Sequence, residues 1–81
     1  MSLDKIRKEI EAIDAKIIEL LAKRLELAIS TRDFKTQAED LNREQEVASY
    51  LANFAKKNHL SIEYIQSLYK LIILESKRHQ K

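Results

Sequence analysis

An apolar repeat near the start of the chain constrains the fold more than any other feature of the sequence. Isoleucine and leucine return every three or four positions, at Leu3, Ile6, Ile10, Ile13, Ile17 and Leu20. This spacing is typical of one face of an amphipathic helix that packs on other helices. It predicts a first helix over residues 3–35, starting at Ser2 or Asp4, with a length of about 50 Å. Such a helix is longer than a compact globule of 81 residues, so it must project alone or pack along a second chain, and we expect an oligomer.

Two basic residues interrupt this predicted face. Arg24 takes the next position of the repeat, and Lys35 follows about three turns later, so the two would lie within about 20° of one face and roughly 16 Å apart. Burying an unpaired charge costs several kcal/mol, so both cations need anionic partners in the protein or in a ligand. Arg7 lies beside the repeat about 25 Å from Arg24, so the two cannot hold one small ligand from a straight helix. Arg7 is therefore either a surface arginine or part of a pocket completed by another chain.

The composition excludes several classes of protein. Because the chain has no Gly and no Pro, its connections should be short and built from Asn, Asp and Ser. The absence of Cys removes disulfides, thiolate metal sites and a Cys nucleophile, and a cytoplasmic location is expected. The charged start MSLDKIRKEIEAID, with no apolar run near the roughly 20 residues of a membrane span, predicts neither a signal peptide nor a membrane protein. The net charge of +2 comes from interleaved acids and bases, so nucleic-acid binding is not expected.

A second helix is predicted after a polar connection over residues 36–42. Asn42 has the form of a cap, with Asp40 as the alternative, and the helix should run to about Lys57. Its inner face is expected to hold Val47, Leu51 and Phe54. Extending that face backwards gives Glu44 and Asp40, whose carboxylates can also be interpreted as caps that complement the helix dipole.

A third helix is predicted after a second connection over residues 58–61. His59 should be an exposed turn residue, and Ser61 should cap the helix. The apolar stripe of this helix comprises Ile62, Ile65, Leu68, Tyr69, Leu71, Ile72 and Ile73. The stripe continues into Ser76 and Gln80, and polar side chains at buried positions need hydrogen-bond partners.

Each predicted helix thus breaks its apolar stripe with polar residues. These are Arg24 and Lys35, then Asp40 and Glu44, then Ser76 and Gln80. They can converge in one polar cavity inside a helical bundle, or they can form a buried network of salt bridges. The chain has no nucleophile–base pair, no paired carboxylates at glycosidase-like positions and no Gly-rich phosphate loop. Any catalysis would therefore depend on positioning and electrostatics.

The chain resembles the AroQ-type chorismate mutases, which are all-helical. The matching residues are Arg7 in LDKIRKEIEAID, Arg24 in LLAKRLELA, Lys35 in RDFK, Asp40, Arg43 and Glu44 in EDLNREQEV, and Ser76 and Gln80 in LIILESKRHQ. The match extends over nearly the whole chain, and the Asp-x-x-Arg-Glu and Ser-x-x-x-Gln elements are specific in combination. The resemblance implies a single all-α domain over residues 1–81, a three-helix protomer intertwined as a homodimer with two shared sites.

The resemblance also implies an activity, the intramolecular Claisen rearrangement of chorismate to prephenate in the synthesis of phenylalanine and tyrosine, with no metal or cofactor. Arg24 and Arg7 of the other chain would each hold a carboxylate of the dianionic substrate. In the same way, Ser76 and Arg43 would assist these contacts, and Asp40 and Glu44 would accept from the ring hydroxyl or orient nearby groups. Lys35 and Gln80 would donate to the ether oxygen. An amide at position 80 donates at any pH, so we expect a flat rate from mildly acid to mildly alkaline pH.

The sequence leaves two alternative functions open. The first is an isochorismate–pyruvate lyase on the same fold, which the Asp-x-x-Arg-Glu element disfavours. The second is a non-catalytic helical dimerisation module whose polar residues set the register as ion pairs. The chain also departs from the family pattern. Only four residues separate Lys35 from Asp40, and Lys77 follows Ser76 where an apolar residue is common.

Overall fold

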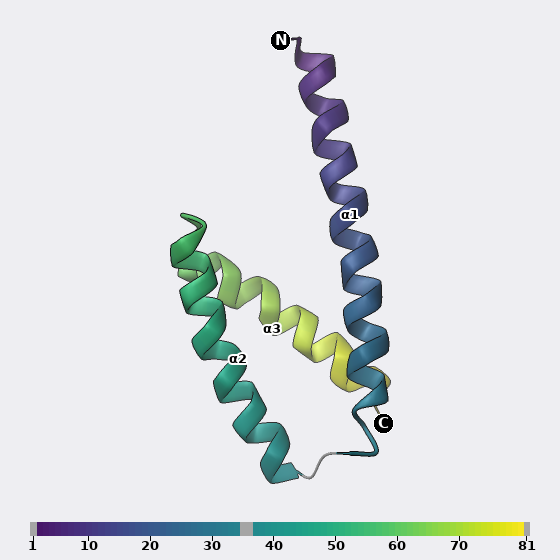
Figure 1. Ribbon diagram of the computed structural model, residues 1–81, viewed down its shortest axis with the longest axis vertical. Coiled ribbons are helices and arrows are strands. Elements are labelled where there is room, and N and C mark those ends of the chain that lie inside the picture. Colours follow the sequence, from purple (N-terminus) through teal and green to yellow (C-terminus); the bar gives the residue numbers. More distant parts are fainter. Residues whose placement is uncertain (1, 35–36, 81) are drawn as a thin grey trace.

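Three helices and no strand make up the described part of the chain. The computed structural model describes residues 2–34 and 37–80, and the side chains of residues 35–41 lie outside the description. The helices are α1 (Leu3–Ser30), α2 (Gln37–Lys57) and α3 (Ile62–His79). Helix α3 packs against both α1 and α2, and the N-terminal half of α1 projects well beyond them (Figure 1). The all-α, three-helix prediction is confirmed.

Helix α1 begins as expected but ends earlier than predicted. The Ser2 hydroxyl accepts a hydrogen bond from the Lys5 amide at 3.2 Å, which confirms Ser2 as the cap. The helix stops at Ser30, so the prediction of a helix to Lys35 is wrong. The prediction that Arg24 and Lys35 share a face of one helix is therefore wrong as well, and Lys35 itself lies outside the described residues.

Two hydroxyl groups explain the early end of α1. The Ser30 hydroxyl donates to the Leu27 carbonyl and the Thr31 hydroxyl to the Ala28 carbonyl, both at 2.7 Å. The Thr31 amide also donates to the Ala28 carbonyl, three residues back, at 3.2 Å. These contacts tighten the last turn and satisfy its carbonyls without a further helical turn.

Helix α2 begins at Gln37, so the prediction that Asn42 or Asp40 caps it is wrong. The residues before Asn42 include Gln, Ala, Glu and Leu, which have high helix propensity, and the absence of Pro and Gly removes any obstacle. Asp40 therefore stands in the first turn of α2 and Asn42 inside it.

The buried face of α2 differs from the predicted one at a single position. Val47 and Leu51 are buried as expected, but Phe54 is 56% exposed and Ala55 is buried in its place. Val47, Leu51 and Ala55 follow one another at a spacing of four, so they form one line along the helix surface. The small side chain of Ala55 allows α3 to approach this line closely. Phe54 instead lies against Tyr50, with ring centroids 5.6 Å apart.

The turn between α2 and α3 contains no glycine, although one of its residues takes a left-handed conformation. The Leu60 amide bonds the Ala55 carbonyl at 2.9 Å and the His59 amide bonds the Lys56 carbonyl at 3.2 Å, which is the pattern of a Schellman cap. His59 takes the left-handed position with φ of 58° and is exposed, as predicted for a turn residue. The Ser61 hydroxyl then accepts from the Tyr64 amide at 3.2 Å, which confirms Ser61 as the cap of α3.

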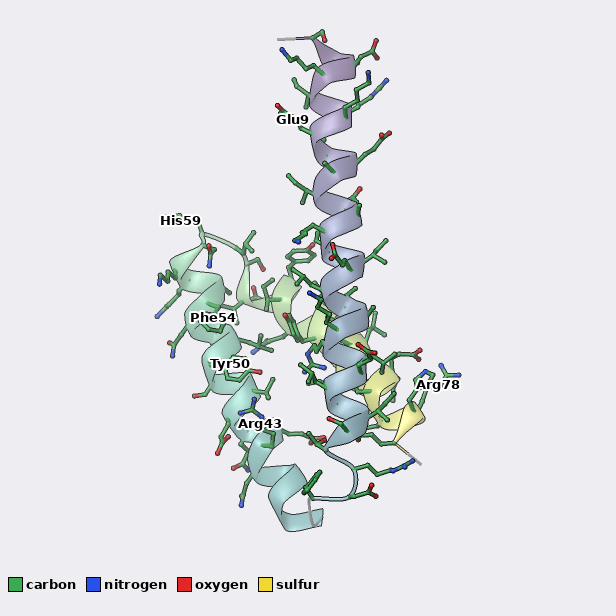
Figure 2. All side chains as sticks on the ribbon, turned by 45° about the vertical axis from the view of Figure 1, so that its right-hand side comes forward. Glu9, Arg43, Tyr50, Phe54, His59 and Arg78 are labelled. Atoms are coloured by element: carbon green, nitrogen blue, oxygen red, sulfur yellow. The ribbon has the colours of Figure 1, made fainter. Side chains whose placement is uncertain are left out.

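The apolar stripe of α1 remains open to solvent in this single chain. No residue of α1 is buried, and Ile10 and Ile13 are 50% and 59% exposed. Figure 2 shows that the part of α1 around Glu9 stands clear of the other two helices. Exposed apolar area of this extent is typical of a surface that another chain covers. None of the described helices combines the length and the hydropathy needed to cross a membrane.

Candidate active site

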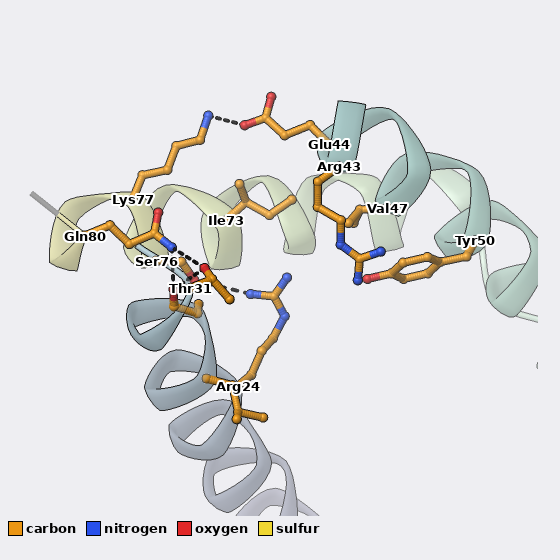
Figure 3. A pocket seen from close by; sticks show the side chains of 12 residues that line it. Arg24, Thr31, Arg43, Glu44, Val47, Tyr50, Ile73, Ser76, Lys77 and Gln80 are labelled. Carbon is orange, nitrogen blue, oxygen red and sulfur yellow. Dashed lines mark hydrogen bonds and ion pairs between the residues drawn. The ribbon is translucent and has the colours of Figure 1, made fainter. Parts of the chain in front are cut away.

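A cavity of about 560 Å³ lies where the three helices meet (Figure 3). Its described walls comprise Arg24, Leu27, Ala28, Thr31, Arg43, Glu44, Val47, Tyr50, Ile73, Ser76, Lys77 and Gln80. Three of these side chains are cationic and one is anionic, so the described walls have two net positive charges. A concave site of this size and charge suits a small anionic molecule.

Arg24 reaches the cavity from α1 and is held by contacts with α3. Its Nη1 donates to the Ser76 hydroxyl at 3.3 Å, and its guanidinium carbon lies 5.8 Å from the centre of the Tyr69 ring. Ser76 is 7% exposed and donates its own proton to the Ile72 carbonyl at 3.1 Å, so its oxygen is free to accept from Arg24. Among the described residues no acid forms a salt bridge with Arg24, and its charge is therefore available to a ligand.

Gln80 joins the ends of α3 and α1. It forms the C-cap of α3, and its Nε2 donates to the Ala28 carbonyl at 2.6 Å and more weakly to the Thr31 hydroxyl at 3.5 Å. The two cross-helix contacts, Arg24 to Ser76 and Ala28 to Gln80, are one helical turn apart on both helices. Together they fix the crossing of α1 and α3 at the cavity.

Helix α2 contributes Arg43 and Glu44. The Arg43 guanidinium lies 5.5 Å from the centre of the Tyr50 ring and bonds the Glu46 carboxylate at 3.2 Å. Figure 3 shows the guanidinium groups of Arg24 and Arg43 pointing into the same space from opposite walls. Glu44 forms an ion pair with Lys77 of α3.

The structure brings five of the eight predicted site residues to this one cavity, namely Arg24, Arg43, Glu44, Ser76 and Gln80. Arg7 is not among the residues that line it, and lies exposed on the projecting part of α1. Lys35 and the Asp40 side chain lie outside the described residues. Nothing in the structure tests whether these eight residues bind a substrate, so those roles stay predictions.

Three polar residues that line the cavity, Thr31, Tyr50 and Lys77, were not among the predicted site residues. Thr31 is two turns beyond Arg24, and Tyr50 is three residues beyond Val47, so helical spacing could have found both. Lys77 was noted only as a departure from the family pattern. Its pairing with Glu44 joins two residues far apart in the sequence, and no local pattern predicts such a contact.

The fold and the cavity together define a class, an all-helical domain with a cationic cavity between its helices. No group of three His, Cys, Asp or Glu side chains within the described ranges is placed to hold a metal. Comparison with known families then narrows the class. Residues 6–81 match the family described as chorismate mutase type II, and the chain belongs to that family.

The curated relatives are longer, two-function proteins. The chain is 40% identical over 79 residues to the bifunctional chorismate mutase/prephenate dehydratase of Buchnera aphidicola subsp. Schizaphis graminum, a match that covers 93% of this chain and 20% of the relative. It is 36% identical over 75 residues to the protein of the same description from Escherichia coli strain K12, covering 88% of this chain and 19% of that protein. The chain therefore spans about a fifth of the length of the relatives it matches. No solved structure matches it.

Proposed function

We propose that this chain catalyses the rearrangement of chorismate to prephenate, a step in the synthesis of phenylalanine and tyrosine. The observation that supports this most is Arg24, a half-buried cation with no described acidic partner, in a cavity whose described walls have two net positive charges. Chorismate has two carboxylates, and the family is named for this reaction. Similar cavities in helical bundles hold ligands through side chains that converge from facing helices.

The reaction suits this set of residues. One C–O bond breaks and one C–C bond forms within a single molecule, so no nucleophile or proton transfer is needed. Arg24 would hold one carboxylate through two parallel hydrogen bonds, with Ser76 and Arg43 beside it. Because Ser76 and Tyr69 already fix the Arg24 side chain, little ordering remains to be done when the substrate arrives.

Gln80 and Lys35 would stabilise the charge that grows on the ether oxygen. Gln80 would keep its bond to the Ala28 carbonyl and exchange the long contact with Thr31 for the substrate oxygen. Asp40 and Glu44 would accept from the ring hydroxyl or orient nearby groups. Donors fixed in advance, together with selection of the compact substrate conformer, would have to supply about 8 kcal/mol for a ~10⁶-fold acceleration.

We further propose that two copies intertwine as a homodimer with shared sites. The exposed apolar stripe of α1 supports this, because a second copy would cover it. The position of Arg7, on the projecting part of α1 and outside the cavity of its own chain, agrees with a role in the partner's site. The cytoplasmic location expected from the Cys-free sequence also stays a proposal.

An ultraviolet assay of chorismate consumption tests the activity, and salicylate formation from isochorismate tests the lyase alternative. Lys35→Ala should reduce turnover strongly with the fold intact, whereas a non-catalytic dimerisation module would show only lowered stability. For the shared site, the variants Arg7→Ala and Arg24→Ala should each be inactive alone. Mixing them should restore activity, because a mixed dimer contains one intact site.

The neighbouring exposed Lys8 gives the matched control, since Lys8→Ala should leave the rate unchanged. Failure of the mixed sample to regain activity, with exchange of subunits shown independently, would contradict the shared site.

A further inference from the structure

We propose that Lys77 is a positioning residue that neutralises Glu44 and so keeps the cavity attractive to a dianion. This inference rests on the proposed function. Lys77 lies on α3 and Glu44 on α2, and their ion pair crosses from one helix to the other at the cavity (Figure 3). Both residues line the cavity.

The charge of the described walls makes the pair necessary. Arg24 and Arg43 face the space where an anion would bind, but the Glu44 carboxylate lines the same space and would repel a second negative charge. An ammonium in contact with that carboxylate cancels most of this repulsion, which leaves the two arginines to act on the ligand. Without Lys77 the described walls would have only one net positive charge.

The pair also fixes where the carboxylate points. Glu44 is not held by a partner on its own helix in any described contact, whereas Arg43 beside it bonds Glu46 one turn along α2. The ion pair therefore orients Glu44 from α3 and links the two helices at the cavity. The side chains of Lys77 and Glu44 are 46% and 34% exposed, so solvent screens the pair and its effect on stability should be modest.

The size of the effect on binding follows from Coulomb's law. One uncompensated unit charge about 8 Å from a dianion, in a water-like dielectric, changes affinity by about fivefold. Lys77→Met keeps most of the length of the side chain and removes its charge, so it should raise KM for chorismate about fivefold. Lys77→Arg should restore most of the wild-type KM.

A double substitution separates this role from a direct contact with substrate. Adding Glu44→Gln to Lys77→Met removes the repelling carboxylate, so KM should return toward the wild-type value although one more charged residue is lost. The value of kcat should be low in this double variant and in Glu44→Gln alone, because Glu44 belongs to the proposed site. If Lys77 contacted a substrate carboxylate, the double variant would have a higher KM than Glu44→Gln alone, because that contact would still be missing.

Lys70→Met is the matched control, because Lys70 is exposed on the same helix and does not line the cavity. Equal KM values for Lys77→Met and Lys70→Met would overturn the inference while the proposed function stood. If the wild-type chain did not consume chorismate, the proposed function would fail on that result alone. The thermal unfolding of the two single variants and the double variant then still decides whether the pair couples α2 to α3. We expect the two substitutions to be coupled by about two- to fivefold in the folding equilibrium. Additive effects of the two substitutions would show that the pair does not couple the helices.

Discussion

The amide of Gln80 offers the sharpest test of how the cavity works. Gln80→Glu changes little in shape, but the carboxyl group can donate a hydrogen bond only while it is protonated. At this position it would face two oxygen atoms, the Ala28 carbonyl and the Thr31 hydroxyl. Their proximity should raise the pKa of the introduced carboxyl above the ordinary range of a glutamate, because its charged form is disfavoured.

Gln80→Glu should affect both the stability of the protein and the rate of the reaction. Above its raised pKa the introduced carboxyl loses the bond that Gln80 makes to the Ala28 carbonyl and places a charge against that oxygen, at a cost of about 1–2 kcal/mol. A domain of this size would then melt roughly 5–10 °C lower. The protonated fraction that can assist the reaction also falls about tenfold for each pH unit above the pKa.

The sign of the pH dependence follows from the direction of the shift. A raised pKa in the folded state gives stability that is present at low pH and lost as the pH rises through that pKa. Both kcat/KM and the melting temperature of Gln80→Glu should therefore fall between mildly acid and neutral pH, while the wild-type rate stays flat. Steady-state rates and thermal unfolding from pH 5 to 9 measure both quantities.

Gln80→Leu is the control, since it removes the donor without adding a titrating group. Its rate should be low at every pH and should show no slope. A flat profile for Gln80→Glu, or a steep loss of wild-type activity between pH 6 and 8, would refute the assigned role of the amide.

Three further predictions concern other parts of the molecule. Ile10→Glu places a charge in the exposed stripe of α1 and should convert a dimer to a monomer in light scattering, and an unchanged mass would count against the dimer surface. Tyr50→Leu removes the ring beside Arg43 and should raise KM by about two- to fivefold. An unchanged KM would show that the ring does not position Arg43. The pKa of Glu63 is lowered by its own backbone amide and by the Ser61 hydroxyl, so part of the stability should be lost as the pH falls through that pKa. In thermal unfolding, Glu63→Gln should lose less stability than the wild type as the pH falls. An equal loss of stability would contradict this role of Glu63.

Local chemistry allowed the helices to be predicted from the sequence. The capping hydroxyls of Ser2 and Ser61 act on amides only three residues away, and the apolar repeat acts over successive turns. The same local spacing placed Arg24, Glu44, Ser76 and Gln80 on inner faces, which is why these four members of the cavity wall could be predicted from the sequence.

Two predictions from the sequence, the inner face of α2 and the end of α1, were wrong because local features allowed more than one outcome. The stripe of α2 allowed either Phe54 or Ala55 to face inward, and close packing against α3 chose the smaller side chain. The hydroxyls of Ser30 and Thr31 ended α1 before Lys35, although nothing in the apolar pattern marks that point as an end.

Three amphipathic helices, two of their caps and the inward direction of most of the polar residues could be predicted from the sequence, because each of these depends on neighbours within a few turns. Which residues meet across helices could not be predicted, because it depends on the tertiary packing. The ion pair of Glu44 with Lys77 and the bond from Gln80 to the Ala28 carbonyl join residues far apart along the chain. Such pairings depend on how the helices cross, and that crossing results from the packing of the whole chain.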